Sequence, residues 1–124
     1  MPGQGRRVAV TGIGAVSALG NNLGEFQRSL AAARCGVRDL PAEMTAGSGV
    51  KVGAHIDWDP AAHFKGPEAG ILDRVTQFAL TAAGEAIAAS GLLGADPAAS
   101  LRNRIGVYWG TGMGGANTDR KSVV

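Results

Sequence analysis

Residues 6–20 read RRVAVTGIGAVSALG, and this stretch decides the fold of the 124-residue chain. A short strand is predicted over residues 7–11, because its Val-Ala-Val run has no polar alternation and is typical of a strand covered on both faces. Gly12 and Gly14 then allow the backbone to leave that strand sharply. The next residues, 15–19, stay largely apolar, so the loop that they form is expected to lie in the interior.

Two other interpretations of this stretch have less support. An arginine pair before an apolar segment imitates an export signal, but Thr11, Ser17 and three glycines interrupt the segment. A dinucleotide-binding fingerprint needs Gly-x-Gly-x-x-Gly at the start of a helix, and Ser17 occupies the third glycine position. An NAD(P)-binding oxidoreductase domain therefore stays open as the lesser alternative.

The composition indicates part of a larger protein. Alanine supplies 22 residues and glycine 20, which together make a third of the chain and leave few large side chains to fill a core. Small residues let helices and strands approach closely. That helps when further layers surround them, but it weakens a small domain that must bury enough apolar area alone.

Charge and cysteine content exclude several classes of protein. The net charge is +2, and the nine arginines and three lysines are scattered, so nothing beyond the basic balance favours nucleic-acid binding. A single cysteine, Cys35, excludes an internal disulfide and fits a reducing compartment. No apolar run approaches the roughly 18 residues of a membrane span. We therefore expect a cytoplasmic chain with no nucleic-acid or membrane partner.

Hydrophobic spacing places the elements of the first half. It predicts a helix over residues 23–33 that is capped by one of the pair 21–22 and closed near Gly36. Residues 39–49 are expected to form a surface loop, and residues 50–56 a short strand.

The second half is expected to complete a β-α-β pattern. Asp59 is expected to cap a short helical turn. The longest helix is predicted over residues 67–90 and is closed by Gly91. Its polar residues, Gln77 and Glu85 among them, lie mostly off its apolar face. A second strand follows at residues 104–109. A strand, a helical crossover and a strand predict a parallel sheet, with residues 8–11 and 105–109 as neighbours.

Three motifs then resemble the β-ketoacyl-acyl-carrier-protein synthases. The opening stretch is similar to their Arg-Arg-Val-x-Val-Thr-Gly-x-Gly-x-Val-Ser-x-Leu-Gly-Asn. Residues 72–83, LDRVTQFALTAA, resemble Met-Asp-Arg-x-x-Gln-x-Ala-x-x-Ala-Ala, and residues 106–115, GVYWGTGMGG, resemble Gly-Val-x-x-Gly-Thr-Gly-x-Gly-Gly. The motifs follow the family's order at about its spacing and extend to about residue 117. The resemblance is to the dimeric elongating synthases of fatty-acid and type II polyketide systems.

This resemblance implies a thiolase-like α/β fold with αβαβα layers, of which residues 1–124 form the N-terminal portion of the N-terminal domain. It also implies acyltransferase chemistry: a cysteine accepts an acyl chain, a malonyl thioester is decarboxylated, and a Claisen condensation joins the two. The implied partners are acyl carrier protein, acyl and malonyl thioesters, and a second subunit in a homodimer or heterodimer. It implies no cofactor and no metal.

The family's catalytic residues have no counterpart here. Its nucleophile lies in a Thr-Ala-Cys-x-Ser-like turn several tens of residues after the Gly-Thr-Gly loop, and two histidines lie further on. We therefore expect the isolated chain to be inactive, with a non-catalytic remnant or a partner-binding subunit fragment as the alternative. We also expect uncovered apolar faces and an unpaired sheet edge, which favour aggregation or dependence on a partner.

Four single residues invite a functional role. Cys35 is expected to be non-catalytic, because the C-terminus of a helix disfavours a thiolate. His55 and His63 are expected to be structural or exposed, because no third ligand stands at a metal-binding spacing. Met113 is the one residue expected to touch substrate. By resemblance it lies at the acyl pocket near the dimer interface, where its flexible side chain limits the length of the acyl chain.

Overall fold

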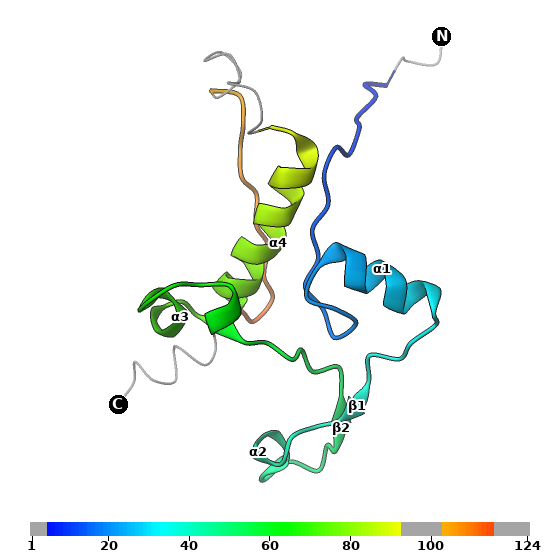
Figure 1. The fold of residues 1–124 in the computed structure, drawn as a ribbon, viewed down its shortest axis with the longest axis vertical. Helices are drawn as coiled ribbons and strands as arrows, with labels where there is room; N and C mark the ends of the chain where they lie inside the picture. The colour runs from blue at the N-terminus through cyan, green and yellow to red at the C-terminus, as the bar shows by residue number, and fades with distance from the viewer. Residues whose placement is uncertain (1–4, 93–102, 116–124) are drawn as a thin grey trace.

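The computed structural model describes residues 5–92 and 103–115, so both ends of the predicted unit 1–124 lie outside it (Figure 1). Its regular elements are, in chain order, α1 (Leu23–Ala31), β1 (Arg38–Asp39), α2 (Ala42–Thr45), β2 (Val52–Gly53), the 3-10 helix η1 (Pro60–Ala62), α3 (Glu68–Ile71) and α4 (Arg74–Ser90). The longest of them, α4, has an extended segment from each half of the chain alongside it (Figure 1).

Reciprocal capping starts α1. The side chain of Asn22 accepts a hydrogen bond from the backbone N–H of Glu25 at 2.9 Å. The Glu25 carboxylate in turn accepts one from the backbone N–H of Asn21 at 2.8 Å. These two bonds satisfy donors near the helix start that would otherwise face water. The predicted asparagine cap is confirmed.

An alanine closes α1 where a glycine is usual. Ala33 has a φ of 50°, its N–H donates to the Leu30 carbonyl at 3.0 Å, and the N–H of Arg34 donates to the Ser29 carbonyl at 2.9 Å. This pair of bonds is a Schellman motif. The predicted closure near Gly36 was therefore wrong. The left-handed backbone at Ala33 costs about 1–2 kcal/mol, because a Cβ crowds the following carbonyl in this conformation.

The predicted helix over residues 67–90 is broken in two. Leu72 and Asp73, between α3 and α4, are extended, with ψ of 129° and 148°. The Asp73 side chain accepts a hydrogen bond from the backbone N–H of Val75 at 2.9 Å, so this aspartate starts a new helix instead of continuing the first. Gly91, with a φ of 70°, closes α4 as predicted.

A small antiparallel hairpin replaces the predicted strand over residues 50–56. β1 pairs with β2 so that Arg38 lies opposite Gly53 and Asp39 opposite Val52. Both β1 and the four-residue helix α2 lie in or beside the segment predicted as a loop. The hairpin extends away from α4 and α1 (Figure 1).

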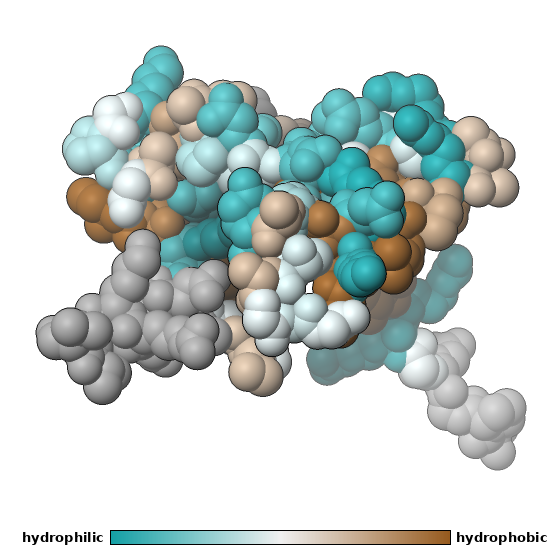
Figure 2. Space-filling view, turned by 90° about the horizontal axis from the view of Figure 1, so that it is seen from below, coloured by the Kyte–Doolittle hydropathy of each residue, from teal (hydrophilic) through white to brown (hydrophobic). Residues whose placement is uncertain are grey.

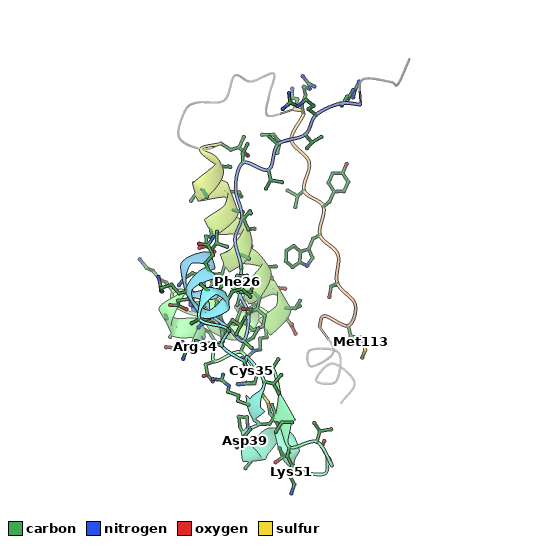
Figure 3. The ribbon with its side chains drawn as sticks, turned by 90° about the vertical axis from the view of Figure 1, so that its right-hand side faces the viewer. Phe26, Arg34, Cys35, Asp39, Lys51 and Met113 are labelled. Atoms are coloured by element: carbon green, nitrogen blue, oxygen red, sulfur yellow. The ribbon has the colours of Figure 1, made fainter. Side chains whose placement is uncertain are left out.

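The two predicted parallel strands are extended segments without strand pairing. Residues 8–11 and 105–109 carry no strand, and within the described residues no backbone hydrogen bond joins them. Both run opposite to α4 and therefore parallel to each other (Figures 1 and 3). A β-strand requires a paired neighbour, whereas these segments contact different ends of α4. The first segment continues to residue 16 and lies by Ala86 and Ser90, and the second continues to residue 115 and lies by Val75 and Leu80.

The glycines of the first segment act through close approach and not through a turn. A Cβ on Gly12 would overlap the carbonyl oxygen of Ala86, and one on Gly14 would overlap that of Ala82. Neither glycine has a positive φ. The prediction of a sharp turn at these positions was wrong, and their small size instead brings the segment against the backbone of α4.

No hydrophobic side chain is buried among the described residues. Val8 and Val107 are 89% and 90% exposed, and Tyr108 is 97% exposed, although the sequence predicts that the first of these segments is covered on both faces. Hydrophobic and hydrophilic residues lie side by side on the surface (Figure 2). Apolar area of this extent normally marks a surface that other protein covers.

Candidate functional site

A cavity of about 480 Å³ lies between the first half of α4 and residues 109–115. Its lining from α4 includes Val75, Ala79 and Leu80, and its lining from the loop includes Trp109, Thr111 and Gly114. Cavities of this size with mainly apolar walls are typical of small-molecule sites. The cavity is therefore the strongest candidate for a substrate site in the described part of the chain.

A local hydrogen bond shapes the glycine loop beside this cavity. The Thr111 hydroxyl accepts a hydrogen bond from the backbone N–H of Gly114 at 2.9 Å, and Gly115 adopts a φ of 87° that favours glycine. A Cβ on Gly114 would lie 2.9 Å from Val75 and would overlap the Thr111 hydroxyl. The loop can approach α4 this closely only because position 114 has no side chain.

Met113 lies next to this cavity along the chain but does not line it. Gly114, the next residue, and Thr111, two residues earlier, line the cavity, whereas the Met113 side chain is 85% exposed. It extends outward near the end of the described second segment (Figure 3). A role for Met113 in substrate binding remains a prediction.

Glu85 holds the first segment and α1 against α4. Its carboxylate accepts a hydrogen bond from the backbone N–H of Ala15 at 3.1 Å, and the N–H of Leu23 lies 2.9 and 3.0 Å from its two oxygens. Leu23 is the first residue of α1, where the helix dipole favours a negative charge. This carboxylate takes the place that a pyrophosphate would need, which removes the basis of the dinucleotide interpretation.

Gln77 is a buried polar link that the sequence interpretation placed on the outside. It is 4% exposed, and its side-chain oxygen accepts a hydrogen bond from the Trp58 indole at 2.8 Å. Its amide nitrogen donates to the carbonyls of Ala69 and Leu72 at 2.9 and 3.0 Å. The only sequence signal was the glutamine in the Met-Asp-Arg-x-x-Gln pattern. Helical periodicity alone assigns a polar residue to solvent.

Cys35 and the two histidines do not form a catalytic group in the described residues. Cys35 is an exposed free thiol in a second cavity whose lining contains no histidine. His63 stacks on Trp58 with 4.0 Å between ring centroids, and His55 Nδ1 lies 3.6 Å from a carboxylate oxygen of Asp57. Within residues 5–92 and 103–115, no group of three or more side chains could hold a metal ion.

Comparison with known proteins identifies the family. The family model for the beta-ketoacyl synthase N-terminal domain matches residues 5–123, and the chain belongs to this family. The resemblance read from the three motifs is thereby confirmed.

Individual relatives include synthases of two kinds. The chain is 37% identical over 110 residues to the tetracenomycin polyketide synthase ketoacyl synthase alpha subunit of Streptomyces glaucescens, which covers 88% of this chain and 25% of the relative. It is 33% identical over 111 residues to the 3-oxoacyl-[acyl-carrier-protein] synthase 2 of Coxiella burnetii, which covers 89% of this chain and 26% of the relative. The chain thus spans about a quarter of the length of these curated relatives. None of the described helices is long and apolar enough to cross a membrane.

Proposed function

We propose that this chain is the N-terminal part of a 3-oxoacyl-[acyl-carrier-protein] synthase of fatty-acid or polyketide synthesis. The observation that carries this proposal is the match of residues 5–123 to the beta-ketoacyl synthase N-terminal domain. The relatives include a polyketide synthase subunit and a 3-oxoacyl-[acyl-carrier-protein] synthase 2, so the proposal covers both pathways. A thiolase-like fold, a cytoplasmic location, a dimer and an acyl carrier protein partner belong to the same proposal.

The proposed reaction exchanges one thioester for another and then forms a carbon–carbon bond. A cysteine thiolate displaces the carrier thiol from an acyl thioester and becomes acylated. Loss of CO2 from a malonyl thioester leaves an enolate carbon, which attacks the acyl carbonyl and releases the cysteine thiolate. Cys35 is not proposed as this nucleophile, because it is an exposed thiol and the lining of its cavity contains no histidine. The nucleophile and the two histidines are expected outside this chain.

The proposed contribution of this chain is a wall of the acyl site. The cavity beside α4 is lined mainly by apolar groups and has a volume of about 480 Å³, which suits an acyl tail. Met113 directly precedes Gly114, which lines the cavity, and its unbranched side chain has three rotatable bonds. Rotation about these bonds is proposed to move the thioether towards or away from the cavity as acyl chains of different length bind.

A chimera tests the proposed function. Residues 5–115 of this chain replace the matching segment of the Coxiella burnetii synthase, and 3-oxoacyl product is measured with acyl and malonyl carrier proteins. We expect product from the chimera and none from the isolated 124-residue chain. A folded chimera without turnover, beside an active parent enzyme, would contradict the proposal. So would turnover by the isolated chain that Cys35→Ser abolishes.

The exposed apolar segments favour a second candidate, a non-catalytic fragment that binds a partner. Val8, Val107 and Tyr108 offer apolar surface that a partner could cover. The coding DNA beyond codon 124 separates the two candidates. An in-frame Thr-Ala-Cys motif followed by the two histidines supports the synthase, whereas its absence supports the fragment.

A further inference from the structure

A second cavity, of about 210 Å³, lies where the loop of residues 17–21 meets the C-terminal turn of α1. The polar and charged residues of its lining include Ser17, Asn21, Arg34, Cys35, Arg38 and the acidic Asp57. Figure 3 shows Arg34 and Cys35 close together below α1. The lining is mainly polar, and neither the motifs nor the proposed synthase reaction uses it.

The charged groups of this second cavity leave one positive charge in excess. Arg38 contacts the Asp57 carboxylate at 2.7 Å and the His55 carbonyl at 2.9 Å. Both contacts use Nη2, which leaves Nη1 and Nε as further donors. The Arg34 side chain has no hydrogen bond or ion pair with any described residue. Asp57 is therefore neutralised by Arg38, and Arg34 remains to attract an anion.

The turn after α1 holds Arg34 at this cavity. The left-handed conformation of Ala33 directs the chain back, so that the Arg34 N–H reaches the Ser29 carbonyl at 2.9 Å. Ser29 also lines the cavity and is 5% exposed. Because the Schellman bonds pair the Ser29 and Leu30 carbonyls, part of the negative end of α1 is satisfied without the guanidinium.

We propose that the second cavity binds a small oxyanion of the phosphate class. The planar donor forks of Arg34 and Arg38 match the oxygens of such an anion. The Ser17 hydroxyl and the second amide N–H of Asn21 are additional donors in the lining. Since a water molecule occupies about 30 Å³ of liquid, the cavity has room for a phosphate group and bound waters. This proposal does not depend on the proposed function.

The single thiol of the chain reports on occupancy of this cavity. Iodoacetamide alkylation of Cys35 is followed by mass spectrometry of its peptide while inorganic phosphate is added at constant ionic strength. The measurement is made on the 124-residue chain and on the chimera. We expect saturable slowing of alkylation by phosphate. Because one charge-assisted contact is lost, Arg34→Gln should weaken the apparent affinity for phosphate roughly tenfold. Arg28→Gln, an exposed change elsewhere on α1, should leave this affinity unchanged.

A second variant keeps the test decisive if Arg34→Gln disturbs folding. Arg34→Lys keeps the positive charge but loses the planar pair of guanidinium donors, so phosphate should protect Cys35 from alkylation to a degree between the original chain and Arg34→Gln. Three results would overturn the proposal. They are no saturable protection in either protein, equal protection by chloride at the same ionic strength, and equal phosphate affinity in the original chain and both Arg34 variants.

Discussion

Replacing Glu85 by alanine should detach the first segment and α1 from α4. The carboxylate accepts hydrogen bonds from two backbone N–H groups, those of Ala15 at 3.1 Å and Leu23 at 2.9 and 3.0 Å. A hydrogen bond to a charged group contributes about 1.5–3 kcal/mol, and the lower value applies here because the groups are partly exposed. Two such bonds give a loss of about 3 kcal/mol. Glu85→Gln keeps one acceptor oxygen and should lose about half of this.

Hydrogen exchange and urea unfolding of the chimera measure this effect. A loss of about 3 kcal/mol corresponds to roughly a hundredfold faster exchange at the Leu23 amide, since 1.4 kcal/mol is tenfold. Glu43→Ala is the matched control, because this exposed glutamate in α2 should change stability by less than about 0.5 kcal/mol. If Glu85→Ala and Glu43→Ala unfold at the same urea concentration, or if the Leu23 amide keeps its protection, the assigned role of Glu85 is wrong.

Four further outcomes are expected. Ala33→Gly should stabilise the chimera by about 1 kcal/mol in urea unfolding, because it relieves the left-handed strain; a lower midpoint would refute this. The hydrogen bond from the Asn21 N–H is the main cause that lowers the pKa of Glu25, followed by Asn22 and then Arg28. The stability that the ionised Glu25 side chain adds to the folded state is therefore present above the usual glutamate pKa, and it is lost as pH falls through the lowered pKa of Glu25. Helix content measured by circular dichroism should decrease over this pH range, and Glu25→Gln should remove the part of the decrease that is due to Glu25. In the chimera, Met113→Phe should reduce turnover of long acyl chains more than of short ones, with Met113→Ala as the control; equal loss at all lengths would indicate a structural role. The isolated chain should aggregate or bind a hydrophobic dye, and cooperative unfolding of a monodisperse monomer would contradict this expectation.

Sequence alone determined the features that depend on neighbouring residues. Asp59 accepts a hydrogen bond from the Ala61 N–H at 3.0 Å and starts η1, and Asn22 and Gly91 begin and end their helices as predicted. A cap requires only a suitable side chain within a few positions of a free backbone group, so the local sequence contains the whole signal. The family followed similarly, because three motifs between residues 6 and 115 agree with it in order and spacing, and its family model matches residues 5–123.

Tertiary structure decided which polar residues turn inward and which extended segments pair. The acceptor for the Ala15 N–H is 70 positions away at Glu85, and Gln77 is buried because Trp58, 19 positions earlier, supplies a donor. Helical periodicity cannot reveal such contacts, since it separates apolar from polar residues but does not identify a distant partner. For the same reason, the apolar pattern of residues 8–11 and 105–109 predicted strands. A strand also needs backbone partners at hydrogen-bonding distance, and α4 contacts these segments without supplying them.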